Sequence, residues 1–154
     1  MKKALIILGF CLALLPTLAA AQGLDKYIEL LRSDLRTQKV ELLTDALDLT
    51  DAQGPTFWPI QREYQTKLDK LQDTRIAMIK DFYQSYEQMD AAKAKTLMNQ
   101  AFKFQDQRTA LLKDYAAKVS KAVSPMVAAR FAHTEAFVQA LGDVQIRGEV
   151  PLTP

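Results

Sequence analysis

The sequence has few of the side chains on which catalytic and metal sites are most often built. Only one histidine and one cysteine occur among its 154 residues. Histidine is the usual general base and metal ligand, and a tetrahedral zinc site draws on several histidine or cysteine ligands. His133 has Glu135 two positions away, and helical residues two apart do not face each other. We predict that His133 is an ordinary surface or half-buried residue, with a metal site shared across a dimer as the alternative.

Motifs for covalent catalysis and for phosphate binding are absent as well. The chain contains no Gly-x-Ser-x-Gly nucleophile elbow and no glycine-rich phosphate loop. Hydrolytic carboxylate pairs stay open, since 18 acidic residues allow many combinations, but none stands in a distinctive context. We predict a protein that is not an enzyme and that uses no cofactor and no metal.

The N-terminal segment has the layout of a signal peptide. Lysines at 2–3 precede an apolar run over 4–15, and small residues follow at 19–21, which is the order found in cleavable leaders. The run is shorter than the roughly 20 residues that span a bilayer as a helix, so a retained membrane anchor is the weaker alternative. We predict that residues 1–21 are removed, that the protein acts in the periplasm, and that it keeps no integral membrane segment.

Cleavage changes both the thiol content and the charge. Cys11 lies within the apolar run and follows Phe10 instead of a small residue, which argues against a lipid anchor. It would leave with the leader, so no disulfide could form afterwards. Loss of Lys2 and Lys3 from 20 basic residues leaves as many basic as acidic ones, 18 of each. A neutral chain has no general attraction to nucleic acid, and we predict no nucleic-acid partner.

Glycine is scarce, at five residues, and apolar residues recur at spacings of three and four, which is helical periodicity. The length predicts one domain, over 22–142. We predict an all-α fold of four helices, two of them long, in an elongated antiparallel hairpin arrangement. The predicted helices cover 24–47, 55–88, 91–123 and 125–142, and an extended tail follows over 143–154.

Capping residues indicate where the second helix begins. Thr50 and Gln53 form a capping box, in which each side chain bonds the main-chain N–H of the other residue. Pro55 suits a first helical turn. Pro59, farther in, predicts a kink or a later start of the regular helix.

Similar signals bound the last two helices. Asp90 is the predicted cap of the third helix, and Ser124 that of the fourth, with Pro125 at the first helical position. Gly142 is the predicted end of the fourth helix, because glycine and proline recur over 143–154 and disfavour a continuing helix.

Both long predicted helices carry a narrow apolar stripe with one arginine inside it. Each arginine either snorkels or lines a groove between helices. Because a narrow stripe buries little area within one chain, surplus apolar surface tends to be covered by a partner. We predict a thin homodimer, and an ordinary closed four-helix bundle is the alternative. The stripes hold Phe57, Ile60, Tyr64, Leu68, Leu71, Arg75, Met78, Phe82 and Met89, and Ala94, Leu97, Ala101, Phe104, Arg108, Leu111, Tyr115 and Val119.

The four methionines that follow the predicted leader admit two interpretations. Methionine thioethers can bind copper, but methionine is also an ordinary filler of hydrophobic cores. Since they lie on the stripes or next to them, we predict core packing. They are Met78, Met89, Met98 and Met126.

Aromatic residues gather toward both ends of the second predicted helix and on the third. Phe102 and Phe104 lie about 200° apart around a helix, so both cannot face one seam. Packing against a neighbouring helix is one interpretation, and an exposed surface that binds other polypeptides is the other. The candidate polypeptide-binding surface consists of Phe57, Trp58, Tyr64, Arg75, Phe82, Tyr83, Tyr86, Phe102, Phe104 and Arg108.

The run Leu49-Thr50-Asp51-Ala52-Gln53 is an unbroken Leu-Thr-x-x-Gln motif, placed after a leader and one helix and before a long helix. In this setting the sequence resembles the LTxxQ-motif family of periplasmic, Spy/CpxP-like proteins, as a divergent member. The family usually repeats the motif before its last helix. Here that stretch reads Val123-Ser124-Pro125-Met126-Val127, in which Ser124 keeps the capping role and a valine replaces the glutamine.

The resemblance implies a thin, all-helical, antiparallel homodimer that holds unfolded polypeptides without ATP or modulates the envelope stress response. Related members sense or buffer metals, but their histidine-rich segments are missing here. We therefore expect a chaperone or stress modulator that binds unfolded or envelope proteins. The alternatives are a metal-responsive sensor that uses His133 and the methionines, and a structural envelope protein that docks through residues 143–154.

Overall fold

The computed structural model describes residues 37–149. The predicted signal peptide, the first part of the first predicted helix and the end of the predicted tail, 150–154, lie outside this range. Backbone proximity divides the chain after Val40. The description below concerns the second unit, from Glu41 onward.

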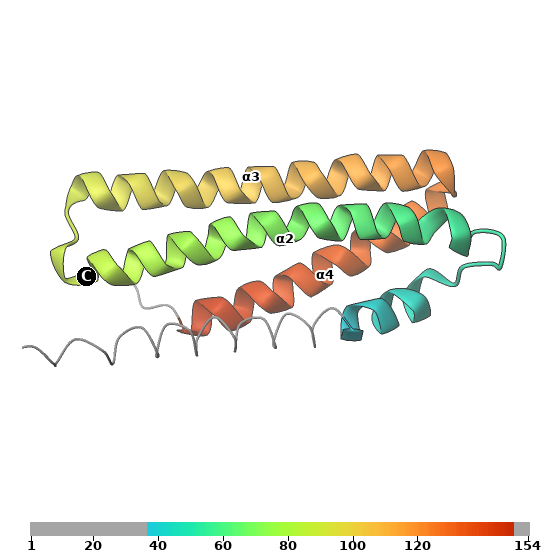
Figure 1. Cartoon of the computed structure of the whole chain (residues 1–154), viewed down its shortest axis with the longest axis horizontal. Coiled ribbons are helices and arrows are strands. Elements are labelled where there is room, and N and C mark those ends of the chain that lie inside the picture. The colour runs from blue at the N-terminus through green and yellow to red at the C-terminus, as the bar shows by residue number, and fades with distance from the viewer. Residues whose placement is uncertain (1–36, 150–154) are drawn as a thin grey trace, which may run out of the picture. The chain divides into compact units, whose positions relative to one another are not determined.

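The described residues form helices joined by short turns. A helical segment over 37–47 is followed by α2 (Gly54–Ser85), the 3-10 turn η1 (Tyr86–Gln88), α3 (Ala91–Ala122) and α4 (Pro125–Glu149). The long helices α2 and α3 have 32 residues each and pack antiparallel, with α4 along them (Figure 1). The predicted all-α fold with two long antiparallel helices is confirmed. None of the described helices is both long and apolar enough to span a bilayer.

The helices α3 and α4 begin at the predicted caps. The Asp90 carboxylate accepts a hydrogen bond from the main-chain N–H of Lys93 at 2.7 Å. The Ser124 hydroxyl accepts one from the N–H of Val127 at 3.1 Å. Each bond satisfies an N–H group that the first helical turn leaves without an internal partner.

The start of α2 departs from the predicted capping box. The Gln53 side chain accepts from the Thr50 N–H at 3.1 Å as predicted, but the Gln53 N–H donates to the Thr50 carbonyl at 2.9 Å, not to its hydroxyl. The helix already begins at Gly54, so the later start predicted from Pro59 is wrong. The bond that Pro59 cannot make would reach residue 55, in the first turn, where its loss matters little.

The loop before α2 is tied to α4. The helix over 37–47 ends at Asp48, whose φ of 49° is the left-handed conformation that often ends helices and that aspartate tolerates. Arg130 of α4 donates from Nη1 to the Leu47 carbonyl at 2.9 Å and lies 3.7 Å from the Asp48 carboxylate. Leu47 is fully buried, and Leu49 of the Leu-Thr-x-x-Gln motif packs against the same core.

The helix α4 is longer than predicted. It continues past Gly142 to Glu149, so the prediction that residues 143–149 are extended is wrong. An interior glycine costs a helix only about 1 kcal/mol relative to alanine. Asp143, the next residue, is bonded to both other helices, and this anchorage offsets the cost.

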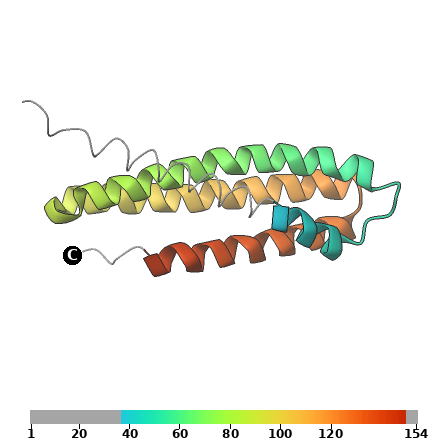
Figure 2. The same ribbon diagram turned by 60° about the horizontal axis from the view of Figure 1, so that its bottom comes forward.

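The hydrophobic core lies at the end of the helical body where α3 turns into α4 (Figures 1 and 2). Phe131 of α4 packs edge-on against Phe57 and Tyr64 of α2, with ring centroids 5.8 and 5.3 Å apart. Toward η1 the core thins out: of the described apolar residues between Arg75 and Phe104, Leu97 alone is buried. The core comprises Leu43, Leu47, Phe57, Ile60, Tyr64, Leu68, Tyr115, Val119, Val127, Ala128 and Phe131.

The helices α2 and α4 meet only through long side chains. No Cα atom of α4 lies within 8 Å of one of α2, whereas α3 approaches both helices this closely. The space between α2 and α4 is spanned by Phe57, Tyr64 and Arg75 from α2, and by Phe131 and Asp143 from α4. The position of α4 therefore depends on these side chains as well as on α3.

Candidate functional site

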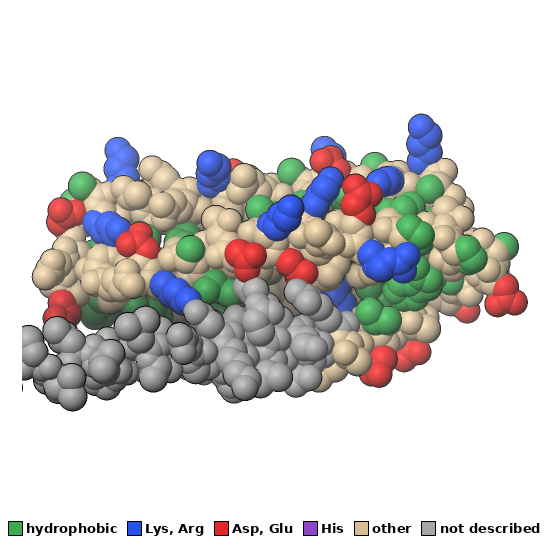
Figure 3. All heavy atoms as spheres, viewed as in Figure 1, with side chains coloured by type: hydrophobic (Ala, Val, Ile, Leu, Met, Phe, Trp, Pro, Cys, Tyr) green, Lys and Arg blue, Asp and Glu red, His purple; other side chains and the backbone are tan. Residues whose placement is uncertain are grey.

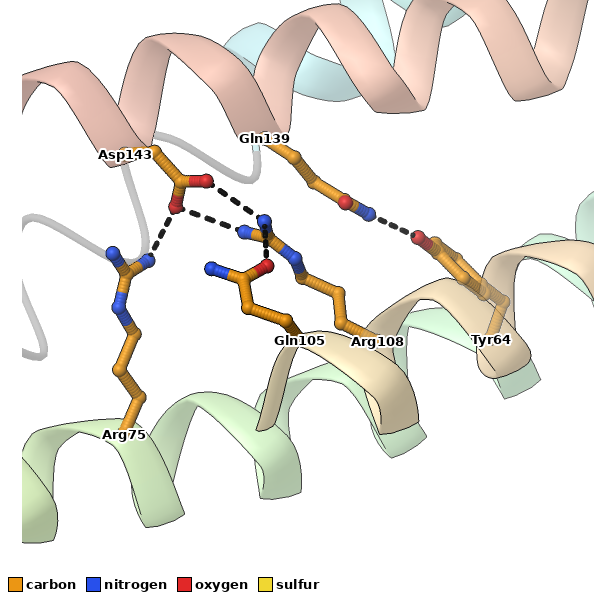
Figure 4. A network of polar contacts seen from close by, with 6 residues as sticks. All are labelled: Tyr64, Arg75, Gln105, Arg108, Gln139 and Asp143. Carbon is orange, nitrogen blue, oxygen red and sulfur yellow. Dashed lines mark hydrogen bonds and ion pairs between the residues drawn. The ribbon is translucent and has the colours of Figure 1, made fainter. Parts of the chain in front are cut away.

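Both arginines of the predicted stripes bind one carboxylate (Figure 4). Arg108 donates to both oxygens of Asp143, from Nη1 to Oδ1 at 2.9 Å and from Nη2 to Oδ2 at 2.7 Å. Arg75 donates from Nη1 to Oδ1 at 2.7 Å. Arg108 also donates to Gln105 Oε1 at 2.6 Å. These four residues form what we call the arginine cluster, in which the two-point Arg108 contact is the strongest geometry for such a pair.

The arginine cluster joins three helices in a nearly dry environment. Arg75 comes from α2, Gln105 and Arg108 from α3, and Asp143 from α4 (Figure 4). The Arg75 and Arg108 side chains are only 9 and 10% exposed. Both guanidinium carbons lie 5.3 Å from the centroid of the Phe104 ring, which offers a favourable π face to a cation. The arginines therefore do not snorkel to solvent; as in the other interpretation they lie between helices, where they are buried against one carboxylate.

The charge balance of the cluster keeps Asp143 ionised. Burial acts to raise the pKa of Asp143, but the hydrogen bonds and charges of Arg108 and Arg75 outweigh it and lower the pKa below its ordinary value. Two cations and one anion leave the cluster with a net positive charge. The cluster thus holds a carboxylate that the chain itself supplies.

A second polar contact lies beside the cluster on the same face of α4. Gln139 donates from Nε2 to the Tyr64 hydroxyl at 2.9 Å (Figure 4). Glu135, one turn earlier, is fully buried. Burial, and next the charge of Glu135, raise the pKa of Tyr64, so its phenol stays protonated. Polar side chains from Glu135 to Asp143 therefore point toward the other two helices.

The outward face of α4 carries four exposed apolar side chains, with the exposed Arg130 and His133 between the first and the second of them. Met126, Phe137, Leu141 and Val144 are 65, 52, 56 and 72% exposed, and they lie on one side of the helix by their spacing. We call these four residues the outer α4 strip. In this part of α4 polar residues four apart, at 135, 139 and 143, face the other helices, and Leu141 faces outward. The i, i+4, i+8 spacing of these polar residues is the sequence signal that could have identified this face.

A second exposed apolar surface lies at the tip of the α2–α3 hairpin. Tyr83 is 48% exposed, Met98 50% and Phe102 62%. By the 3.6-residue period Met98 lies on the same side of α3 as Gln105, seven residues later, whereas Tyr83 is turned about 80° from the side of Arg75. Ile79 and Tyr86, both half-buried, lie about one turn before and after Tyr83. We call Ile79, Tyr83, Tyr86, Met98 and Phe102 the hairpin-tip surface.

Burial corrects the predicted polypeptide-binding surface. Phe57, Tyr64 and Phe104 are at most 3% exposed, because the 3.6-residue period turns them toward the other helices. Arg75 and Arg108 are committed to Asp143, and Trp58 is half-buried against Phe57, with ring centroids 5.1 Å apart. The other four candidates gather at the hairpin tip, where Phe82 packs edge-on against Tyr83 and Tyr86. Phe102 and Phe104 face different ways, as predicted.

The methionines divide between core and surface. Met78 and Met89 are half-buried, but Met98 and Met126 are 50 and 65% exposed, so the prediction of core packing is wrong for these two. His133 is exposed on α4. Within residues 37–149 no three histidine, cysteine or acidic side chains come close enough together to hold a metal ion.

Comparison of the chain with protein-family models, with curated proteins and with solved structures found no match. The resemblance to the LTxxQ-motif family stays a prediction.

The arginine cluster predicts a large loss of stability when Asp143 is removed. We expect Asp143→Ala to lower the free energy of unfolding by about 3 kcal/mol, because it leaves two buried guanidinium groups without their counter-ion. The exposed Asp106→Ala on α3 is the matched control and should change it by less than about 0.5 kcal/mol. Urea denaturation followed by circular dichroism measures both. Equal effects of the two substitutions would contradict the role given to Asp143.

The lowered pKa of Asp143 predicts acid sensitivity with a defined sign. Unfolded Asp143 takes up a proton near 3.8, its ordinary pKa, whereas the folded carboxylate does so at lower pH. The pair therefore contributes its full stability above that pH and loses it as the pH falls through the folded pKa. We expect the stability difference between the natural protein and Asp143→Asn to be constant near pH 7 and to shrink below about pH 4. A difference that does not change with pH would contradict the assignment.

Proposed function

We propose that the protein is a periplasmic, ATP-independent chaperone or envelope-stress modulator that binds unfolded polypeptides through the hairpin-tip surface. The observation that carries the proposal is the exposure of Tyr83, Met98 and Phe102 in the part of the α2–α3 hairpin nearer η1, where the hydrophobic core thins out. Exposed apolar patches rimmed by polar residues are typical of sites that bind other polypeptides. On the face drawn in Figure 3 hydrophobic side chains gather mainly toward the end where α2 begins, and charged side chains are spread over the rest.

The chemistry of the hairpin tip suits many different partners. Methionine adapts its shape to varied apolar side chains, and tyrosine combines an apolar ring with a hydroxyl that can hydrogen-bond the extended backbone of an unfolded chain. A hollow of about 400 Å³ is lined by Tyr83, Gln84, Tyr86, Glu87 and Gln88. Its mix of aromatic and amide groups favours loose, sequence-tolerant contacts.

The proposed mechanism requires binding alone. The predicted export places the protein where ATP is not supplied, so capture and release depend on the affinity of the surface for exposed apolar segments. The resemblance to LTxxQ-motif proteins supports the same function. No chemical step is assigned to any residue of the chain.

We also propose that two copies pair through the outer α4 strip. Its four apolar side chains are spread over nineteen residues of α4, about 27 Å of helix. A twofold interface places the same patch of both copies face to face, and Phe137, Leu141 and Val144 give the strip an uncharged apolar part. Pairing would cover Val144 and Met126, the two most exposed of the large apolar residues described, and leave the hairpin tips open.

The proposed function predicts that substitutions at the tip weaken protection of a client. We expect the natural protein, at an equimolar ratio, to suppress the light scattering of reduced insulin. Tyr83→Ser and Phe102→Ser should each weaken binding about fivefold, since burial of half an aromatic side chain contributes roughly 1 kcal/mol. Leu42→Ser, at a position 38% exposed outside both surfaces, is the matched control. No suppression by the natural protein would refute the proposal.

The proposed dimer predicts a change of mass when its strip is charged. We expect a dimer in light scattering coupled to gel filtration, and a folded monomer for the double variant Phe137→Asp, Leu141→Asp, because two carboxylates cannot be buried unpaired in an apolar interface. The variant Phe102→Asp, outside the strip, should remain a dimer. A monomeric natural protein would instead indicate that another segment or partner covers the strip.

A further inference from the structure

A row of lysines runs along the outward side of α3. Its members are all exposed and are Lys95, Lys103, Lys113 and Lys121. By the 3.6-residue period they fall within an arc of about 80° around the helix. The buried residues of α3, Phe104 among them, lie on the opposite side, which meets α2 and α4. We call these four lysines the lysine ridge, and Figure 3 shows basic side chains standing out along the edge where Figure 1 places α3.

Internal ion pairs do not account for the lysine ridge. Lys93 and Lys118, which also belong to α3, pair with acidic residues of α2, but within residues 37–149 no ridge lysine forms an ion pair. Helical residues three or four apart can pair. Asp106, three residues after Lys103, is the one acidic residue at such a distance from any of the four. The ridge therefore presents positive charge that the helical body leaves unbalanced.

The negative charge that balances the ridge lies elsewhere in the chain. Residues 41–51 carry four acidic side chains and no basic one. In Figure 1 the helical part of this segment, up to Leu47, lies at the edge of the helical body opposite to α3. Within the arc of the ridge Asp106 is the one acidic residue. A chain that is neutral once the predicted leader is removed thus has a positive side and a negative side.

The spacing of the ridge lysines indicates the kind of partner. The residues between them in the same arc are small and neutral, as at Asn99, Ala110 and Ala117. Successive lysines are about 12, 15 and 12 Å apart along the helix, farther than the Debye length of about 8 Å at physiological ionic strength. Each charge therefore acts on a separate part of the partner. An anionic bilayer is negative at every position along this length, whereas an acidic protein would need carboxylates at matching intervals.

We propose that α3 lies along the surface of an anionic phospholipid bilayer, with the lysine ridge against the lipid phosphates. Lysine suits this partner because its ammonium is a flexible point charge, whereas the planar fork of arginine favours defined two-point contacts. Four basic residues on one helix face reach the number typical of segments that bind anionic lipid. The contact turns residues 41–51 away from the bilayer. It requires neither a client nor a dimer, so it does not depend on the proposed function.

Vesicle flotation tests the proposal with the exported protein, which begins after the predicted leader. We expect binding to vesicles of phosphatidylcholine that contain about 30% phosphatidylglycerol, and none to vesicles of phosphatidylcholine alone. Raising the NaCl concentration from about 50 to about 300 mM should weaken binding about tenfold or more, because salt screens exposed charges. No flotation with the anionic vesicles at low salt would overturn the proposal, also if the protein then bound polyglutamate.

Two quadruple variants separate the ridge from the net charge of the chain. Each lysine near an anionic surface strengthens binding about fivefold. We expect the variant Lys95→Gln, Lys103→Gln, Lys113→Gln, Lys121→Gln to bind at least about twentyfold more weakly, with an unchanged melting temperature. The control removes the same charge from exposed positions outside the ridge and should lose less than about fivefold. Equal losses would overturn the ridge as the contact. The control is Lys67→Gln, Lys70→Gln, Lys80→Gln, Lys118→Gln.

A fluorescent label locates the contact without removing any charge. Ala117, within the ridge, and Ala77, on α2, are both exposed, and Cys11, the only cysteine of the sequence, leaves with the predicted leader. Anionic vesicles with spin-labelled headgroups should quench a dye attached at Ala117→Cys and leave the same dye at Ala77→Cys unquenched. Equal quenching at the two positions would overturn the orientation. Suppression of insulin aggregation needs no lipid, so failure of the bilayer contact leaves the proposed function standing.

Discussion

Asp143 receives hydrogen bonds from two arginines that belong to two different helices. Among the described residues, Asp143 is the only residue of α4 whose ion pairs reach both α2 and α3. Each arginine is buried and would be costly there by itself. The carboxylate offsets that cost only if α4 continues past Gly142 and brings Asp143 to the level of Arg75. The Phe104 ring, in contact with both guanidinium groups, keeps water away from the pair. The length of α4, its position and the burial of the two cations therefore depend on one another.

This dependence divides the helical body into three zones. At the α3–α4 turn, aromatic and aliphatic side chains form an apolar core around Phe131. In the middle, the arginine cluster and the contact between Tyr64 and Gln139 replace apolar packing by directed hydrogen bonds. Beyond the end of α4, two helices remain, and their inward side chains are only partly covered. A gradient from apolar packing to open surface thus runs along α2, and the proposed binding surface lies at its open end.

Periodicity was sufficient to predict the helical fold, the two long helices and the caps Asp90 and Ser124, because these depend on local spacing and local hydrogen bonds. It failed where a distant contact decided the outcome. Local sequence alone predicts that the helix ends at Gly142. The helix continues because Asp143 binds Arg108 and Arg75, which lie 35 and 68 positions away in sequence. The same contact explains why two arginines stand inside apolar stripes. The ten aromatic and basic candidates could not all be sorted into buried and exposed ones, since that depends on which helix faces pack against one another.

The spacing between α2 and α4 restricts substitution in a particular way. No Cα atom of α4 lies within 8 Å of a Cα atom of α2. The side chains that meet between the two helices must therefore span this separation. They are phenylalanine, tyrosine and arginine on α2, and phenylalanine, glutamine and aspartate on α4. A shorter apolar residue at Phe57 or Phe131 would keep the hydrophobic pattern and still leave a gap, since α3 holds both helices at their present separation. At these positions a replacement should therefore be tolerated only if it keeps the length of the side chain, and at Phe57 and Phe131 also its apolar character.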